Sequence, residues 1–258
     1  MGKRADRRAF RDHLKLIGDV AAKVRDKIPG TRRLVVFDGL DQTTHGTEQT
    51  LVIRTNPVTW GFPMDEIVFS RWVMNLYAFR IMPWEPVLTS LSTYIPEARN
   101  LIHEQFVLDV KTSNYLVMLD SDVLPPDDFL ERLLQHIERD PKIHVVGGWY
   151  KRKNQGEIEP VVYHLIDPNM GNSGWKMYTP DEIPRDAEGK PHGLEAVDGA
   201  GAGCWLMTRE AAEAIGPKPY NMNEGGEDLL LCKKLHAKGY KTWIDWSIEC
   251  AHMGVGFY

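Results

Sequence analysis

An alternation of strand-like and helix-like segments between residues 86 and 148 most constrains the fold of this chain. Residues 86–91, 115–119 and 143–146 are short apolar runs of strand length, and the segments between them have helical patterns, the second with apolar residues at 129, 130, 133, 134 and 137. Two strand-like runs at 34–37 and 51–55 come earlier, and Pro63 with Asp65 and Glu66 is typical of a helix start. Strands and helices that alternate in this way form a mostly parallel sheet covered by helices. The pattern therefore predicts an α/β fold, with a mostly parallel central sheet and helices on both faces.

The composition fits one sizeable globular domain. With 258 residues, 43% hydrophobic and 26% charged, the chain is unlike disordered or collagen-like proteins. No apolar run reaches the length of a membrane span, and the basic N-terminus lacks the apolar stretch of a signal peptide. The three cysteines form no CxxC pair, which disfavours a disulfide framework. We therefore expect a cytoplasmic protein without a transmembrane segment.

The charge is divided unevenly along the chain. Residues 1–33 hold 11 Lys/Arg and 4 Asp, whereas the remaining 225 residues hold 20 basic and 32 acidic groups. From Phe10 to Ile28, apolar residues recur at spacings of four and three, which predicts a basic amphipathic helix that ends at Pro29-Gly30. Such an arm could dock on its own domain, form the seam of a homodimer, or contact an anionic acceptor, nucleic acid or membrane headgroups.

The second half of the chain is less regular. The stretch 166–194 is rich in Gly, Pro and Asp, and its length is typical of a functional lid, with a disordered loop as the alternative. Further strands are predicted at 161–165, 195–198, 203–207 and 241–246, and short helices at 209–215 and 227–238.

Two carboxylates, Asp120 and Asp122, follow the apolar run 115–119. Because alternate residues of an extended segment point the same way, both can face one ion. Parallel sheets bind ligands beyond the carboxyl ends of their strands, and a divalent cation would relieve the repulsion between the two carboxylates. Capping of the next helix is the alternative, but Asp127 or Asp128 would serve it better. The sequence therefore predicts a metal or nucleotide site here.

Three residues in the last part of the chain complete the candidate site. Gly225-Gly226 permits close approach of a ligand and leads into a helix whose first turn holds Glu227 and Asp228. Acids are also favourable in any first helical turn, so this placement alone is not specific. His252 follows the last predicted strand and becomes a candidate third ligand if Asp122 holds a cation. Mixed oxygen and nitrogen ligation suits Mn²⁺ as well as Mg²⁺.

Taken in order, these segments resemble a nucleotide-sugar-dependent glycosyltransferase of the GT-A (Rossmann-like) fold, similar to the family 2 type. The resemblance covers about residues 50–254, and the arm before residue 33 is not part of it. We therefore expect the basic helix to form an N-terminal arm at 1–33, followed by a domain at 34–258. The resemblance implies that this domain has a nucleotide-sugar half at about 50–150 and an acceptor half at about 151–258. The matching segments are Asn56-Pro57, IPEARN at 95–100, LDSDV at 119–123, GGWYKRK at 147–153, GAGAGCWLM at 199–207, Glu227-Asp228 and His252.

The resemblance implies a hexosyltransferase-like enzyme that moves a sugar from a UDP- or GDP-sugar to an acceptor hydroxyl of unknown identity, with inversion as the default. Asp122 and His252 would bind Mn²⁺ or Mg²⁺. Asp120 would contact either the ribose of the donor or, through a water molecule, the ion. Asp228, with Glu227 as the second choice, would take the acceptor proton. The donor would be held by Asn56, Arg99, Asp120, Asp122, Lys151 and Lys153.

Some of these roles have structural alternatives. Arg99 and the basic residues at 151–153 could equally form structural ion pairs. Trp175, Tyr178 and Trp205 are the aromatic residues expected to stack on acceptor sugars, although a core position for Trp205 fits its sequence as well.

Two other functions stay open at this point. A nucleotidyltransferase uses a similar sheet with acidic metal ligands, but normally has a glycine-rich phosphate loop after its first strand, and residues 56–61 contain a single glycine. A non-catalytic carbohydrate- or nucleotide-binding module is the other alternative, which the four carboxylates at 120, 122, 227 and 228 disfavour.

Overall fold

The computed structural model describes residues 33–37, 50–54, 57–64, 81, 85–91, 94–152, 159–221 and 226–253. The chain divides into two units, Met1–Asn56 and Pro57–Tyr258. In the first unit, β1 (Arg33–Phe37) and β2 (Thr50–Arg54) form a parallel pair, at the positions where strands were expected. The basic helix expected before residue 33 lies outside the described residues, and the boundary at residue 33 stays a prediction.

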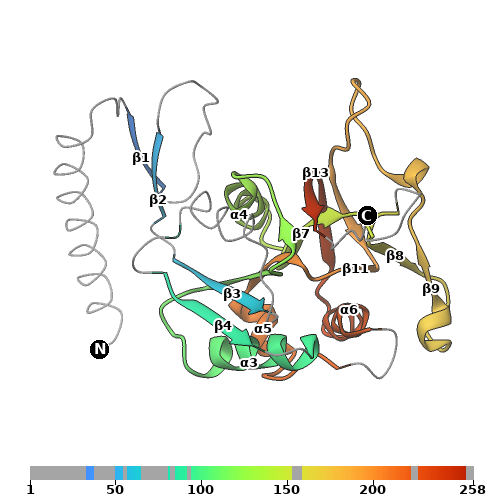
Figure 1. Ribbon diagram of the computed structural model, residues 1–258, viewed down its shortest axis with the longest axis horizontal. Coiled ribbons are helices and arrows are strands. Elements are labelled where there is room, and N and C mark those ends of the chain that lie inside the picture. Colours follow the sequence, from blue (N-terminus) through green and yellow to red (C-terminus); the bar gives the residue numbers. More distant parts are fainter. Residues whose placement is uncertain are drawn as a thin grey trace, which may run out of the picture. The chain divides into compact units, whose positions relative to one another are not determined.

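The second unit is built around a mixed sheet with the strand order β4-β3-β5-β12-β7-β13-β10 (Figure 1). Five of these seven strands run in one direction, and only β12 and β10 run the other way. The expected α/β fold with a mostly parallel sheet is therefore confirmed. The strands are β3 (Val58–Met64), β4 (Val87–Leu91), β5 (Tyr115–Leu119), β7 (Val145–Tyr150), β10 (Leu194–Val197), β12 (Cys204–Thr208) and β13 (Thr242–His252).

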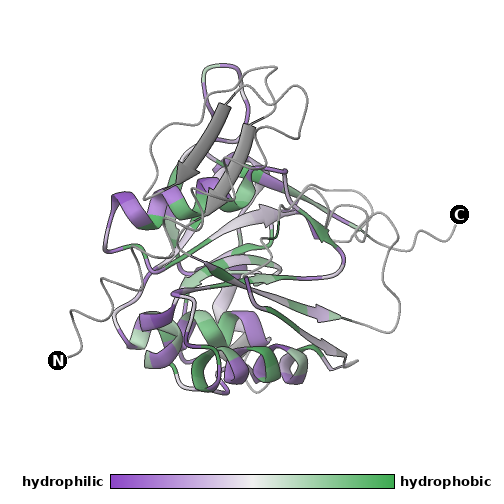
Figure 2. Ribbon diagram, turned by 90° about the vertical axis from the view of Figure 1, so that its left-hand side faces the viewer, coloured by the Kyte–Doolittle hydropathy of each residue, from purple (hydrophilic) through white to green (hydrophobic). Residues whose placement is uncertain are grey.

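Helices cover both faces of this sheet. Figures 1 and 2 show α4 (Phe129–Arg139) on one face, and α3 (Ile95–Leu108), α5 (Arg209–Ala214) and α6 (Glu227–Ala237) on the other. The apolar residues of α4 that the spacing singled out are buried against the strands. Because both faces are covered, the central strand β5 reads as a continuous apolar run, and its residues 116–119 are all buried.

Glycines extend β7 beyond its expected end. Sequence patterning ended this strand before Gly147-Gly148, yet it continues to Tyr150. A Cβ on Gly147 would lie 2.6 Å from the Cys204 carbonyl oxygen, and one on Gly148 would lie 2.6 Å from the Ile248 side chain. These glycines permit close packing of neighbouring strands and do not mark a turn.

β3 was not expected as a strand. The sequence patterns indicated no strand here and predicted a helix opening at Pro63, but Val58–Met64 forms a strand between β4 and β5. Trp60 in this strand is fully buried, and Gly61 lets Ile102 of α3 approach, since a Cβ there would lie 2.6 Å from the Ile102 side chain. Pro63 therefore belongs to β3, and the prediction that it opens a helix was wrong.

The stretch 166–194 has ordered structure of its own. It contains the short strand β9 (Trp175–Met177), which joins β8 (Val162–Leu165) and β11 (Gly199–Ala200) in a second, three-stranded sheet. The turn at 179–182 is closed by a capping box between Thr179 and Glu182. A disordered loop is therefore not what the structure shows, and the lid role stays a prediction.

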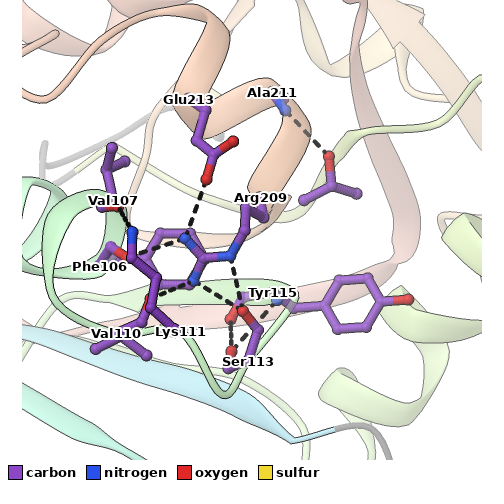
Figure 3. A network of polar contacts seen from close by, with 10 residues as sticks. Phe106, Val107, Val110, Lys111, Ser113, Tyr115, Arg209, Ala211 and Glu213 are labelled. Carbon is purple, nitrogen blue, oxygen red and sulfur yellow. Dashed lines mark hydrogen bonds and ion pairs between the residues drawn. The ribbon is translucent and has the colours of Figure 1, made fainter. Parts of the chain in front are cut away.

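Arg209 joins the C-terminal end of α3 to the start of α5, as Figure 3 shows. Its guanidinium donates to the carbonyl oxygens of Phe106 at 3.1 Å, Val110 at 2.8 Å and Ser113 at 2.8 Å. It also lies 4.2 Å from the centre of the Phe106 ring. Since the last carbonyls of a helix have no intrahelical donors, Arg209 supplies partners that the end of α3 lacks.

Candidate active site

Asp120 and Asp122 lie where β5 ends at the sheet edge. The chain turns directly after β5 and begins the short strand β6 (Val123–Leu124). The Val123 amide donates to the Asp120 carbonyl at 3.1 Å, which closes the turn. The Asp120 amide donates to the Gly203 carbonyl at 3.0 Å, and this bond fixes the turn against the segment before β12.

His252 reaches this turn because the last strand is longer than expected. β13 runs to His252, where it pairs with β6 so that His252 lies opposite Val123. The His252 Nε2 atom lies 3.7 Å from Asp122 Oδ2, and its Nδ1 atom lies 2.8 Å from the Lys151 carbonyl oxygen. A carbonyl can only accept, so Nδ1 is the donor in this contact, and the other ring nitrogen, Nε2, faces Asp122.

These residues fit a divalent cation that takes further ligands from a substrate. Histidines that bind metals commonly donate their other ring N–H to a carbonyl, as His252 does. The buried Asp120 Oδ1 atom has no hydrogen-bond partner within the described part of the chain. Among those same residues, no group of three or more His, Cys, Asp or Glu side chains forms a complete metal site. Mg²⁺ is typically held by one or two carboxylates plus substrate phosphates, so an incomplete protein cage suits it.

Arg99 of α3 lies between the two sets of carboxylates. Its Nη2 atom lies 2.7 Å from Asp120 Oδ2, and its Nη1 atom lies 3.0 Å from Glu227 Oε1 and also contacts Asp228 Oδ1. The Arg99 side chain is only 3% exposed. A charge this buried requires partners, and Arg99 forms the structural ion pairs that were the alternative, while its contact with a donor stays a prediction.

This arrangement perturbs the pKa values of the group. Burial opposes the charge on Arg99, but the carboxylates of Asp120 and Asp228 outweigh it, and the pKa of Arg99 lies well above its ordinary value. Burial raises the pKa of Asp120 and of Asp228, although Arg99 opposes both shifts. Carboxyl groups with raised pKa values at a sheet edge are candidates for proton transfer.

Asp228 and Glu227 form the first turn of α6, as expected. The preceding Gly226 has φ of 98°, a conformation that residues with a side chain rarely adopt, so a glycine is needed at this entry to the helix. The Ala202 amide donates to the Asp228 carboxylate. Asp228 thus lies at the junction of α6, the 201–203 segment and Arg99.

Tyr150 forms a wall of the site that sequence reasoning missed. Its phenol oxygen accepts a hydrogen bond from the Gly203 amide at 3.2 Å, and its ring lies 4.8 Å from the His252 ring. A Cβ on Gly201 would lie 2.2 Å from this phenol oxygen, and one on Gly203 would lie 3.0 Å from Asp120 Oδ2. The glycines at 201 and 203, together with the tyrosine that ends β7, were the available signals.

Of the remaining residues expected to hold the donor, only one lies within the described part of the chain. Lys151 has a carbonyl that accepts from His252, while its ammonium pairs with Glu249 at 2.7 Å and is partly exposed. Asn56 and Lys153 lie outside the described residues.

The aromatic residues expected to bind the acceptor are mostly in the core. Trp205 lies in β12 between β5 and β7 and is 1% exposed, so it occupies the core position that was the alternative. Tyr178 is 5% exposed and stacks on His164 with ring centres 3.9 Å apart. In this conformation neither ring is available to a sugar. Trp175 is half-buried, beside Tyr163 and below the Lys233 ammonium.

Comparison with known families confirms the resemblance that the motifs indicated. The sequence model described as glycosyl transferase family 2 matches residues 105–216, a segment that includes Asp120, Asp122 and β12. Arg99, Asp228 and His252 lie outside the matched segment. Over the matched residues the chain is therefore similar to glycosyl transferase family 2, as the motifs indicated. No curated protein matches the chain.

Among solved structures, the chain is similar to A197 from STIV, with 18% identity and a TM-score of 0.53. That match covers 77% of this chain and 86% of the other. It is also similar to GalNAc-T7, which was crystallised with UDP, GalNAc and Mn²⁺, at 14% identity and a TM-score of 0.45. This second match covers 79% of this chain but only 45% of GalNAc-T7. At such identities, the likeness to A197 concerns the fold alone. Within the described residues, no helix is long and apolar enough to span a membrane.

Proposed function

We propose that the protein is a metal-dependent glycosyltransferase that moves a sugar from a UDP- or GDP-sugar to an acceptor hydroxyl with inversion, as a hexosyltransferase would. The arrangement of carboxylates around Arg99 is the main observation that supports this proposal. Its guanidinium has Asp120 on one side, at the turn where Asp122 and His252 converge, and Asp228 with Glu227 on the other. The proposed donor site and the proposed proton acceptor thus lie on opposite sides of Arg99. Such an arrangement suits a reaction in which the acceptor hydroxyl attacks the sugar from the side opposite the leaving diphosphate.

In this proposal each residue has a defined task. Asp122 and His252 would hold Mn²⁺ or Mg²⁺, which when bound neutralises charge on the leaving diphosphate. As the acceptor oxygen bonds to the anomeric carbon, the bond from that carbon to the diphosphate oxygen breaks, and the acceptor proton passes to Asp228. Burial raises the pKa of Asp228, which makes its carboxylate a stronger base than that of an exposed aspartate, while Arg99 opposes this rise and favours the ionised form.

A screen of UDP- and GDP-sugars for release of nucleoside diphosphate tests the activity without an identified acceptor. We expect release with at least one donor, dependent on Mn²⁺ or Mg²⁺. Once an acceptor is found, NMR of the product bond reports inversion or retention. Release of pyrophosphate from a nucleoside triphosphate would instead support a nucleotidyltransferase. Tight binding of a nucleoside diphosphate without turnover would support a binding module.

We further propose that the protein works in a reducing compartment such as the cytoplasm. Cys204, Cys232 and Cys250 are all free thiols and all buried. Burial raises the pKa of Cys232 to about 12, which keeps this thiol protonated and unreactive. Unchanged activity with and without a reductant such as dithiothreitol is expected, and dependence on an intact disulfide would contradict this location.

A further inference from the structure

A cavity of about 330 Å³ lies between the first two turns of α3 and residues 218–221. We call it the α3 cavity; its lining includes Tyr94, Glu97, Leu101, Lys218 and Tyr220. The volume is at the lower end of the range for small-molecule sites, which suits about one ring of a ligand. None of the residues that form it was expected to contact a substrate on sequence grounds.

The α3 cavity shares a wall with the carboxylate centre. Tyr220 is one of the residues that line the cavity, and the Arg99 guanidinium lies 5.8 Å from the centre of the Tyr220 ring. Arg99 in turn contacts Asp228. Contacts through Tyr220 and Arg99 therefore connect the lining of the cavity to the proposed catalytic base.

This wall is held rigidly in place. The Asn100 side chain donates to the Tyr220 carbonyl at 2.7 Å and accepts from the Tyr220 amide at 2.9 Å. The buried His103 ring packs edge-on against Tyr220, with ring centres 6.2 Å apart. Because the Asn100 side chain holds both the amide and the carbonyl of Tyr220, this wall has little freedom to move. The cavity is therefore largely formed before a ligand arrives.

The lining indicates what kind of ligand fits. Tyr94 is 52% exposed and Leu101 is 41% exposed, so the cavity offers an aromatic face and an apolar edge to solvent. Its charged groups are one acid, Glu97, and one base, Lys218, whose ammonium already lies 3.2 Å from Glu104. A lining without surplus positive charge does not suit a phosphate or a nucleic acid. An aromatic face beside polar groups of both kinds suits a neutral ring rich in hydroxyls.

We propose that the α3 cavity is an acceptor subsite that binds one sugar ring of an oligosaccharide acceptor, apart from the ring that carries the reacting hydroxyl. The proposal rests on the proposed glycosyltransferase function and adds the acceptor class to it. Tyr94 would stack on the ring through its face, and Glu97 and Lys218 would exchange hydrogen bonds with its hydroxyls.

Saturation-transfer NMR with the full chain tests this directly, using cellotriose, maltotriose, mannotriose and chitotriose as probes. At least one trisaccharide should bind the wild type, and Tyr94→Ala should weaken that binding about tenfold or more, as loss of an aromatic anchor does. Tyr94→Phe keeps the ring and should bind within about twofold of the wild type. Leu101→Ala is a second variant in the cavity and should also weaken binding.

The control is Leu108→Ala, because Leu108 is 53% exposed on the same helix but at its far end. It should leave trisaccharide binding unchanged. Binding of no trisaccharide by the wild type, or equal binding by the wild type and both cavity variants, would overturn the subsite. Release of nucleoside diphosphate from the donor without acceptor should be the same in Leu108→Ala and wild type. Loss of that release in the wild type itself would refute the proposed function and not the sugar-binding cavity.

Discussion

The Nε2 atom of His252 lies 3.7 Å from Oδ2 of Asp122, although the two residues lie far apart in the sequence. The pairing of β6 with the last residues of β13 brings them together, and the Met253 amide strengthens it by donating to the Asp122 carbonyl at 2.8 Å. Because backbone pairing sets this geometry, the two side chains face each other without needing a metal to assemble them. They form one part of the proposed donor site, and the carboxylates around Arg99 form the other.

Asp122→Asn and His252→Gln should each weaken binding of Mn²⁺ in the presence of a nucleoside diphosphate. We expect a loss of about 10–100-fold per substitution, because each removes one donor atom from a site with few protein ligands. Titration of Mn²⁺ followed by electron paramagnetic resonance measures it. Asp127→Asn is the matched control, since Asp127 is exposed just beyond the same turn and should bind Mn²⁺ as the wild type does. Equal affinity in all four proteins would remove Asp122 and His252 from the metal site.

Asp228→Asn should lower the rate of sugar transfer by about 10²–10⁴-fold, the usual contribution of a general base. Glu227→Gln should cost less, because Glu227 is the second choice for that role. Burial raises the pKa of Asp228, and a base must be ionised to act, so wild-type transfer should fall as pH drops through a pKa above that of an ordinary aspartate. The pH profile of kcat for the three proteins checks this. If Asp228→Asn keeps both the wild-type rate of sugar transfer and the fall of that rate at low pH, a group other than Asp228 is the base.

Arg99→Met should destabilise the protein by about 3–5 kcal/mol at neutral pH, since it leaves buried carboxylates without their cation. Without this cation the pKa values of Asp120 and Asp228, which burial already raises, would lie higher still. Protonation would then relieve their repulsion, so the loss of stability should shrink as the pH falls through these raised pKa values. Urea unfolding at several pH values measures this. Arg185→Met is the control, because Arg185 is an exposed arginine that donates to the Gly189 carbonyl. A loss that is small, or independent of pH, would contradict the role of Arg99 as the shared counter-charge.

Gly203→Ala should impair catalysis more than it impairs folding. The added Cβ would lie 2.9 Å from the Tyr150 phenol oxygen and 3.0 Å from Asp120 Oδ2, so both groups must shift. We expect a stability loss of about 1–3 kcal/mol together with reduced donor turnover. Gly189→Ala places its Cβ in open space at a φ of 79°, so it should cost about 1–2 kcal/mol without changing turnover per folded molecule. Comparable turnover in the two variants would show that the Tyr150 wall does not matter to the site.

Arg209→Met should destabilise the fold without changing the chemistry. It removes hydrogen bonds to three carbonyl oxygens and a guanidinium stacked on Phe106, and we expect a loss of about 2–4 kcal/mol (Figure 3). Glu213→Gln removes only an exposed ion pair to the same guanidinium and should cost less than about 1 kcal/mol. Thermal and urea unfolding compare the two variants. If both cost the same, the carbonyl contacts of Arg209 contribute little.

Sequence reasoning predicted the elements whose pattern is strong. The apolar run of β5, the spacing in α3 and α4 and the glycine entry to α6 each indicated the element that the structure contains. It missed β3, because Gly61 and Pro63 are typical of turns and only the close approach of Ile102 explains the glycine. It also ended β7 and β13 too early, since glycines inside β7 and the irregular register of β13 broke the expected patterns.

Sequence reasoning predicted which residues lie in the candidate site, but it did not predict which groups they contact. The positions of Asp120, Asp122, Asp228 and His252 followed from strand ends and a helix start. The burial of Arg99 among carboxylates, and of Trp205 and Tyr178 in the core, depends on contacts between segments far apart in the sequence, which no local pattern encodes. Tyr94 and Tyr220 belong to no recognisable sequence motif. Their place beside a ligand-sized cavity is evident only from the structure, where both line the space between α3 and residues 218–221.

Metal-dependent release of nucleoside diphosphate from a UDP- or GDP-sugar tests the central claim most directly. The full chain is stripped with a chelator and Mn²⁺ is then added back, in parallel for the wild type, Asp122→Asn and Asp127→Asn. We predict that chelation abolishes release, that Mn²⁺ restores it in the wild type and Asp127→Asn, and that Asp122→Asn stays inactive at the same concentration. Release by the wild type that survives chelation, or full activity of Asp122→Asn without metal, would contradict it.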